Sequence, residues 1–171
     1  APLSPQIVQV LLDWLPRIAE DRIKESLIRA LGAAKEPFDG KPLVDCFLRD
    51  SSETLRWPIA NTMSLARPYG ISAWLMEAVN NRLFGSAREM LVIALARLVP
   101  AKQALPILMS VLDELPGHVA MALGEIGGPA ELSVLKSQVE DIEGPKWRRA
   151  EMLKAIRRIE KRLRKRGDQI D

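Results

Sequence analysis

The sequence holds few residues that could carry catalytic chemistry, with one histidine and one cysteine in 171 residues. Cys46 has no second cysteine in the chain for a disulfide, and we expect its thiol to be buried in the apolar run around it. Cys46 and His118 together are too few residues to form the clusters of His and Cys that bind zinc or iron. No spacing pairs two carboxylates for acid–base catalysis. The sequence therefore predicts no metal, no cofactor and no catalytic residue.

Long apolar runs are also missing. No stretch approaches the roughly 20 apolar residues of a membrane-spanning helix. The first residues lack the basic and then apolar pattern of a secretory signal, so we expect a cytoplasmic protein. Aromatic residues make up only 5% of the chain, while Leu, Ala, Glu, Lys and Arg are abundant, which favours helix over sheet. The length suits one domain, which we place at residues 1–171.

The chain does contain an internal repeat. A small residue followed by a large aliphatic residue recurs at intervals of 28 to 33 residues. The five pairs are Ala30-Leu31, Thr62-Met63, Ala94-Leu95, Ala122-Leu123 and Ala155-Ile156. Apolar residues also recur seven and three positions before the small residue and four positions after it. We number the apolar position seven residues before the small residue as offset 0. The apolar residues of a repeat then stand at offsets 0, 4, 7, 8 and 11, which form one face of an α-helix.

Prolines separate the repeats at positions 37, 68, 100 and 129, where a helix must end. Each repeat then reads as an outer helix followed by an inner helix. The predicted outer helices are 5–18, 42–50, 71–80, 104–113 and 131–140. The predicted inner helices are 21–34, 52–66, 86–99, 116–126 and 145–166. The residue at offset 9 is small in four inner helices, at Gly32, Ser64, Ala96 and Gly124, which predicts close helix approach there.

The stretches Leu55-Arg56-Trp57-Pro58-Ile59-Ala60-Asn61-Thr62-Met63-Ser64 and Val119-Ala120-Met121-Ala122-Leu123-Gly124 resemble the HEAT-like repeat family, including the short repeats of bilin-lyase-like proteins. The resemblance covers nearly the whole chain. It implies an all-α fold, a right-handed α-solenoid (superhelix) of about five helical hairpins. The repeats would span approximately 3–36, 37–68, 69–101, 102–128 and 129–166, with 145–166 as a basic capping helix.

The resemblance also implies that the inner helices line a concave surface, and it selects the positions that point away from the seam. The predicted partner-binding residues are Arg29, Trp57, Asn61, Glu89, Met90, Ile93, His118 and Met121. Several of them are apolar, which suggests a protein or peptide groove with Trp57 as its anchor. The alternative, equally open, is that these side chains pack on neighbouring helices.

Basic residues gather in two places. One is the column after the first apolar position, which holds Lys24, Arg56, Arg88 and Arg149. In the HEAT-like family such an arginine commonly bonds the acidic turn of the adjoining repeat, although phosphate contacts are an alternative. The other is the last helix, which carries 11 Lys and Arg against 2 Glu over 146–166, a net +9. Its predicted basic patch comprises Arg149, Lys154, Arg157, Arg158, Lys161, Arg162 and Lys165.

A capping helix must have a polar outer face, which explains why the last helix is polar but not why its net charge is positive. Binding of an anionic partner is therefore a second interpretation. We therefore predict a non-catalytic scaffold that binds a protein or peptide, with a nucleic-acid-associated protein as the alternative. A third alternative is an enzyme similar to bilin lyases or to HEAT-like DNA glycosylases, although no motif here carries over their catalytic residues.

Overall fold

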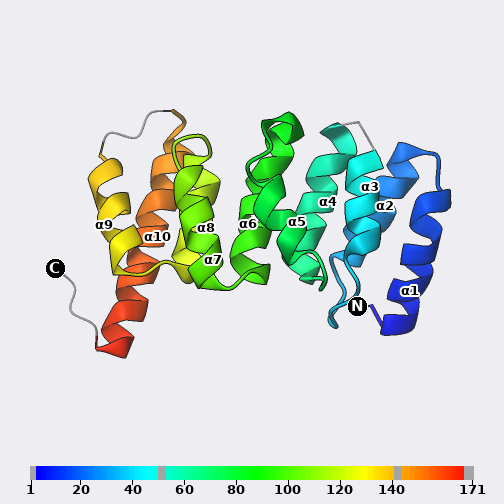
Figure 1. Ribbon diagram of the computed structural model, residues 1–171, viewed down its shortest axis with the longest axis horizontal. Coiled ribbons are helices and arrows are strands. Elements are labelled where there is room, and N and C mark those ends of the chain that lie inside the picture. Colours follow the sequence, from blue (N-terminus) through cyan, green and yellow to red (C-terminus); the bar gives the residue numbers. More distant parts are fainter. Residues whose placement is uncertain (1–2, 50–52, 141–143, 168–171) are drawn as a thin grey trace. The chain divides into compact units, whose positions relative to one another are not determined.

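The computed structural model describes residues 3–49, 53–140 and 144–167, and over these residues the chain is all-helical (Figure 1). Two isolated β-bridges, Leu3 with Ala34 and Asp39 with Tyr69, tie loops together. Among the described residues, no helix is both long and apolar enough to cross a membrane. The chain divides into two compact units, residues 1–98 and 99–171. The prediction of a single repeat domain stays a prediction.

Unit 1 contains three helical pairs. The first consists of α1 (Pro5–Trp14), the short 3-10 helix η1 (Leu15–Arg17) and α2 (Asp21–Leu31). The second consists of α3 (Lys41–Arg49) and α4 (Glu53–Ala66). The third consists of α5 (Ser72–Ala78), the 3-10 helix η2 (Arg82–Ala87) and α6 (Arg88–Leu98). The inner helices α2, α4 and α6 lie side by side in chain order, because α4 packs against both of the others.

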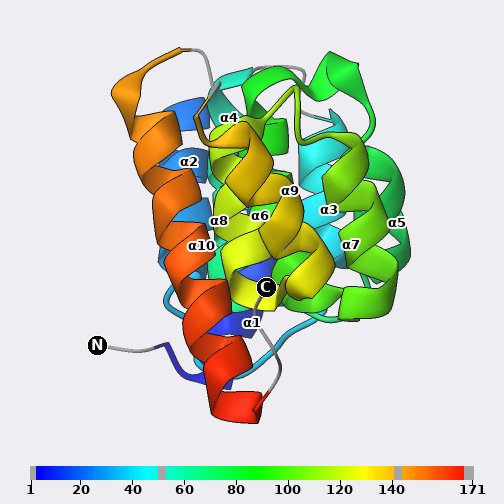
Figure 2. The same cartoon turned by 90° about the vertical axis from the view of Figure 1, so that its left-hand side faces the viewer.

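Unit 2 contains two pairs. They are α7 (Ala101–Ser110) with α8 (Pro116–Ile126), and α9 (Pro129–Gln138) with α10 (Lys146–Arg166). The inner helices α8 and α10 make the most extensive helix contact in this unit, with α9 packed on α10 (Figure 2). Gly124 allows this approach, since a Cβ built there would lie 3.1 Å from the Cα of Ala155.

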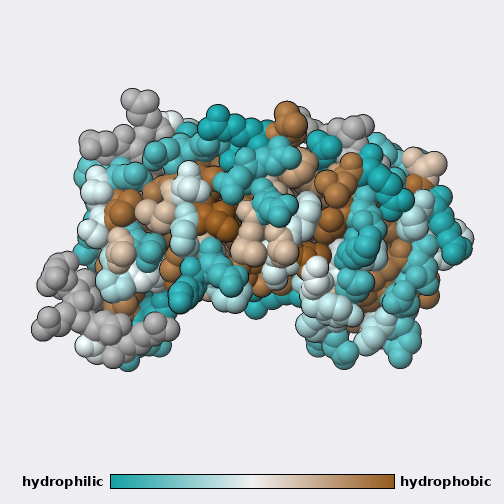
Figure 3. All heavy atoms as spheres, in the orientation of Figure 1, coloured by the Kyte–Doolittle hydropathy of each residue, from teal (hydrophilic) through white to brown (hydrophobic). Residues whose placement is uncertain are grey.

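The apolar columns of the repeat form the core. Ile59, Leu91, Val119 and Met152, at one offset in four repeats, are fully buried, and so are Leu31, Met63, Leu95 and Leu123 at another. Polar side chains cover much of the outer-helix face, with apolar side chains visible in the furrows between helices (Figure 3). The burial of a whole column at a fixed helical offset is what the 3.6-residue period predicts.

The ten predicted helices correspond in order to α1–α10, with ends that differ by a few residues. The largest difference lies in the first outer helix, predicted to reach residue 18, because α1 ends at Trp14 and η1 follows it. In the third pair a helix is predicted from residue 86. Residues 82–87 instead form η2, with Gly85 at φ 51°, and α6 begins at Arg88. The glycine breaks the regular helix because it takes a left-handed φ inside the segment. The predicted helix end at residue 50 and start at residue 52 lie outside the described residues.

Candidate functional site

The arginines of the basic column bind the outer helix of their own pair. Arg56 Nε donates to the Phe47 carbonyl at 3.3 Å, and Arg88 Nε donates to the Val79 carbonyl at 2.8 Å. Each acceptor lies nine residues before its arginine, at the C-terminal end of the outer helix. That end leaves carbonyls without helical partners, and a cation there is favoured by the helix dipole. These two bonds lie within a pair, and a bond from the same column to the adjoining repeat stays a prediction.

The same nine-residue spacing recurs in the last pair, where Arg149 forms an ion pair with Glu140 at 2.6 Å. The recurrence shows that the first turn of an inner helix is tied to the end of its outer helix in three of the five pairs. Arg149, predicted as part of the basic patch, is thus engaged within the protein. Its pair is exposed, with side-chain exposures of 51% for Arg149 and 71% for Glu140.

The predicted partner-binding residues of unit 1 differ in exposure. Arg29 is exposed and forms an ion pair with Glu25 one turn earlier, at 2.7 Å. The others that reach solvent are Trp57, Asn61, Glu89 and Met90, all partly buried. Ile93 is only 2% exposed, so its prediction as a partner contact is wrong. It lies on α6, where six consecutive residues, Leu91–Ala96, are buried.

Leu65 belongs to the same surface and was missed. It lies on α4 one turn after Asn61, so both project from one face of the helix. Its side chain is 55% exposed and reaches toward α2, 3.5 Å from a Cβ built on Gly32. The i+4 spacing from Asn61 was the available signal. We call the residues Arg29, Trp57, Asn61, Leu65 and Met90 the inner-helix surface of unit 1.

In unit 2 the predicted contact residue His118 packs against the neighbouring inner helix. Its ring meets the Trp147 ring of α10 edge-on, with centroids 5.3 Å apart. The same indole lies over Gly117, where an added Cβ would stand 2.2 Å from the Trp147 ring. For His118, the alternative that the side chain packs on a neighbouring helix is therefore correct. Met121, one turn further along α8, is partly buried.

The basic helix α10 uses one of its predicted patch residues internally. Arg162 donates to the carbonyls of Gly124 and Glu125 at 3.1 and 3.0 Å, and also to the carbonyl of Gly127. These carbonyls lie at the C-terminal end of α8, so Arg162 caps that helix. Arg162, predicted as part of the basic patch, is therefore engaged within the protein and only partly exposed. Lys154 is exposed but forms an ion pair with Glu151 at 2.6 Å.

The rest of the predicted patch lies on the exposed side of α10. Arg157, Arg158, Lys161 and Lys165 are joined there by Arg164, and among the described residues none of the five has an ion pair. An open hollow of about 470 Å³ is lined by four of them together with Glu160. Glu160 itself is paired with Lys136 of α9 at 3.2 Å. We call Arg157, Arg158, Lys161, Arg164 and Lys165 the basic surface of α10.

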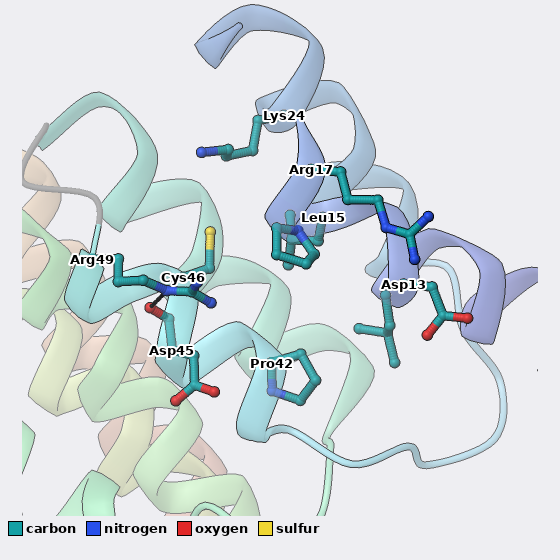
Figure 4. Close-up of a pocket in the computed structure, with 10 residues that line it drawn as sticks. Asp13, Leu15, Arg17, Lys24, Pro42, Asp45, Cys46 and Arg49 are labelled. Atoms are coloured by element: carbon teal, nitrogen blue, oxygen red, sulfur yellow. Dashed lines mark hydrogen bonds between the residues drawn. The ribbon is translucent and has the colours of Figure 1, made fainter. Parts of the chain in front are cut away.

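A cavity of about 480 Å³ separates the first two outer helices of unit 1 (Figure 4). Asp13 and Arg17 line it from the first pair, and Asp45 and Arg49 line it from α3, with Lys24 at its edge. Cys46 borders the cavity but is buried, as predicted. Charges of both signs face the space from both walls, so no single sign of ligand is favoured.

Among the described residues, no three His, Cys, Asp or Glu side chains come together as a metal-binding group. No protein-family model, curated protein or solved structure matches the chain. The surfaces themselves are therefore the basis for a functional conclusion. Two of them have a distinct chemical character: the half-apolar inner-helix surface of unit 1 and the basic surface of α10.

Proposed function

We propose that the protein is a non-catalytic scaffold built from HEAT-like helical pairs in an α-solenoid, and that it binds a protein or peptide on the inner-helix surface of unit 1. Two features support the repeat assignment. The inner helices of unit 1 stack in chain order, and the arginine bond nine residues back recurs in three pairs. Helical repeats that stack in this way commonly use an extended surface for binding.

The observation that carries the proposal is the composition of the inner-helix surface. Trp57, Leu65 and Met90 bring apolar side chains from adjacent helices to partly exposed positions. Asn61 and Arg29 add hydrogen-bond donors beside them. An apolar anchor flanked by amide and guanidinium groups is the usual make-up of a peptide-binding hot spot.

A peptide selected from a displayed library on the intact protein provides the test. Trp57→Ala should weaken its binding by about 30-fold or more, in line with the roughly 2 kcal/mol that defines a hot spot. Leu65→Ala should weaken it less. Leu48→Ala is the matched control, because Leu48 is a leucine of similar exposure, 51%, on the outer helix α3.

Circular dichroism must show that the Trp57→Ala protein is still helical. Loss of binding without loss of fold supports the proposal. Binding that survives both Trp57→Ala and Leu65→Ala would exclude this surface as the site.

A second candidate function is the binding of a single-stranded nucleic acid by the basic surface of α10. The observation that favours it is the group of five cations with no ion pair among the described residues. Cations paired with carboxylates of the protein would gain little from phosphate, whereas these five have no such pair to break within the part of the chain that the structure describes. Lys161→Glu with Lys165→Glu should abolish binding of a labelled oligonucleotide, while Lys24→Glu on α2 should leave it unchanged.

A further inference from the structure

The cavity between the first two outer helices carries the same order of charges on both walls (Figure 4). On the first wall, Asp13 stands four residues before Arg17, and on the second wall, Asp45 stands four residues before Arg49. Figure 4 shows the head of each arginine above the carboxylate of its own wall, with Lys24 above both. Four residues extend about 6–7 Å along these helices. The cavity therefore has a cationic end and an acidic end.

In the part of the chain that the structure describes, neither wall closes its own acid–arginine ion pair. Arg49 Nε donates to the backbone carbonyl of Asp45 at 3.1 Å rather than to its carboxylate. The Arg17 guanidinium lies over a tryptophan ring of its own helix, 5.7 Å from the ring centre. Glu25 and Arg29, at the same spacing on α2, do form an ion pair, at 2.7 Å. The spacing thus permits an ion pair that the cavity walls leave unmade.

The two carboxylates take their present partners from outside the cavity lining. Asp45 is paired with Lys41 at 2.7 Å, and Asp13 accepts from the side-chain amide of Gln9 at 2.8 Å. An ionised carboxylate can accept about four hydrogen bonds, so both keep capacity for a donor inside the cavity. Because Lys41 already offsets the charge of Asp45, Asp13 is the stronger attractor of a cation.

The opposite end of the cavity favours an anion. The outer helices α1 and α3 end near it, and the end of a helix contributes about −0.5 of a charge. Two helix ends therefore amount to about one negative charge. Arg17, Lys24 and Arg49 supply three full positive charges, which outweigh that contribution.

Apolar side chains line the space between the two charged ends. Leu12 and Leu15 are buried, and Pro16 and Pro42 reach the cavity beside them. The volume of about 480 Å³ lies within the range of roughly 300–1,000 Å³ for small-molecule sites. A ligand of this shape would carry opposite charges at its two ends and apolar groups between them.

The distance between the charged ends selects the length of that ligand. A free α-amino acid is too short, because its ammonium group and its carboxylate are attached to the same carbon. Two extended residues span about 7 Å, which matches the separation of arginine and aspartate on each wall. The termini of an unblocked dipeptide carry the required charges, and its side chains supply the apolar groups.

We propose that this cavity binds a zwitterionic dipeptide, with its carboxylate toward Arg17 and Arg49 and its ammonium group beside Asp13. The side chains of the dipeptide contact the leucines and prolines of the lining. The proposal goes beyond the proposed function, because no residue of the inner-helix surface of unit 1 lines this cavity. Trp57→Ala should leave dipeptide binding unchanged, so failure of one proposal does not decide the other.

Titration of the full chain with alanyl-leucine, followed through the amide chemical shifts in NMR, tests the proposal. Amides around the cavity should shift with a dissociation constant of about 1 mM, since exposed ion pairs each contribute little. N-acetyl-alanyl-leucine lacks the ammonium group, and alanyl-leucinamide lacks the carboxylate. Each blocked form should bind at least about fivefold more weakly than the free dipeptide.

Two variants assign the ends of the ligand. Arg49→Gln should weaken alanyl-leucine by about fivefold and leave the weak binding of alanyl-leucinamide unchanged, because the amide has no carboxylate to lose. Asp13→Asn should weaken alanyl-leucine by a similar factor and leave the N-acetyl form unchanged. Arg29→Gln and Glu25→Gln are the matched controls, because they alter an acid–arginine pair of the same spacing outside the cavity.

The crossed pattern of two variants and two blocked ligands supports the proposal. Equal affinity for the free and blocked dipeptides would overturn it, because charge would then not select the ligand. Equal weakening by the control variants would also overturn it, since the contacts would lie outside the cavity. A wild type whose amides do not shift at about 20 mM alanyl-leucine would overturn it outright.

Discussion

The arginine at the start of an inner helix contacts a residue nine positions earlier in two very different environments. Arg88 is buried and bonds the Val79 carbonyl at the end of α5, while Arg149 forms an exposed pair with Glu140. A buried hydrogen bond satisfies a carbonyl that water cannot reach. In an exposed ion pair, water can solvate both charged groups and so replaces most of the interaction. The stability that each arginine provides should therefore differ although the sequence column is the same.

Replacing these two arginines with methionine tests that difference. Arg88→Met should lower the free energy of unfolding by about 1–3 kcal/mol, because the Val79 carbonyl loses a buried donor. Arg149→Met should lower it by about 0–1 kcal/mol, as exposed ion pairs usually do. Urea denaturation followed by circular dichroism measures both. Equal effects would mean that burial does not decide the role of this column.

Sequence reasoning predicted which residues belong to the apolar columns better than which residues reach solvent. Helical period alone places Ile59 and Leu91 in the core, and both are fully buried. Exposure depends on how neighbouring helices lie, which a single repeat does not encode. Ile93 and His118 were assigned to a partner surface, but Ile93 is buried and His118 meets Trp147 of α10. Leu65 was missed although it follows Asn61 by one helical turn, and it is 55% exposed.

At the scale of helices, positions of proline and glycine determined how well the boundaries could be predicted. The inner helices ahead of Pro68, Pro100 and Pro129 end before these prolines, as the backbone of proline requires. Residues 82–87 could not be predicted, because the turn into α6 depends on Gly85 at a positive φ. Arg162 was likewise unpredictable as a cap, since its acceptors lie more than 30 residues earlier in the sequence.

The close approach of α8 and α10 makes Gly124 a sensitive position. A Cβ there would already lie 3.1 Å from the Ala155 backbone, so a larger side chain would force the two helices apart. We expect Gly124→Leu to lower the melting temperature and the unfolding free energy by about 1–3 kcal/mol, the usual cost of overpacking. Ala130→Leu, at an exposed position of α9, is the control and should have little effect. Unchanged stability in Gly124→Leu would contradict this packing of α8 on α10.

Two adjacent residues of α10 should separate stability from binding. Arg162 caps α8, whereas Lys161 lies on the basic surface of α10. Arg162→Met should lower the unfolding free energy by about 1–3 kcal/mol, because three carbonyls at the end of α8 lose their donor. Lys161→Met should leave stability nearly unchanged and weaken oligonucleotide binding instead. The opposite pattern in thermal unfolding would show that Arg162 is not a cap.

For the molecule as a whole, the distribution of charge is more informative than its total. The net charge of the full chain is only +3, yet residues 146–166 carry +9, so the rest of the chain is acidic. A composition-based reading would have assigned a weak basic character to the entire protein. The sequence order localises that character to one helix, and the structure divides that helix between internal contacts and the basic surface of α10.

This division sets an upper limit on the salt dependence of nucleic-acid binding. If all five cations of the basic surface of α10 contact phosphates of a single strand, log K should fall with log salt with a slope of about −3.5, at roughly 0.7 per phosphate. Affinity would then drop about 100-fold between 50 and 200 mM salt. Binding of a selected peptide to Trp57 and its neighbours should change little over the same range, because it depends on apolar contact. Fluorescence anisotropy titrations at several salt concentrations measure both slopes. A slope near zero for the oligonucleotide would exclude phosphate contacts by this surface, and a slope much steeper than the limit would require cations outside it.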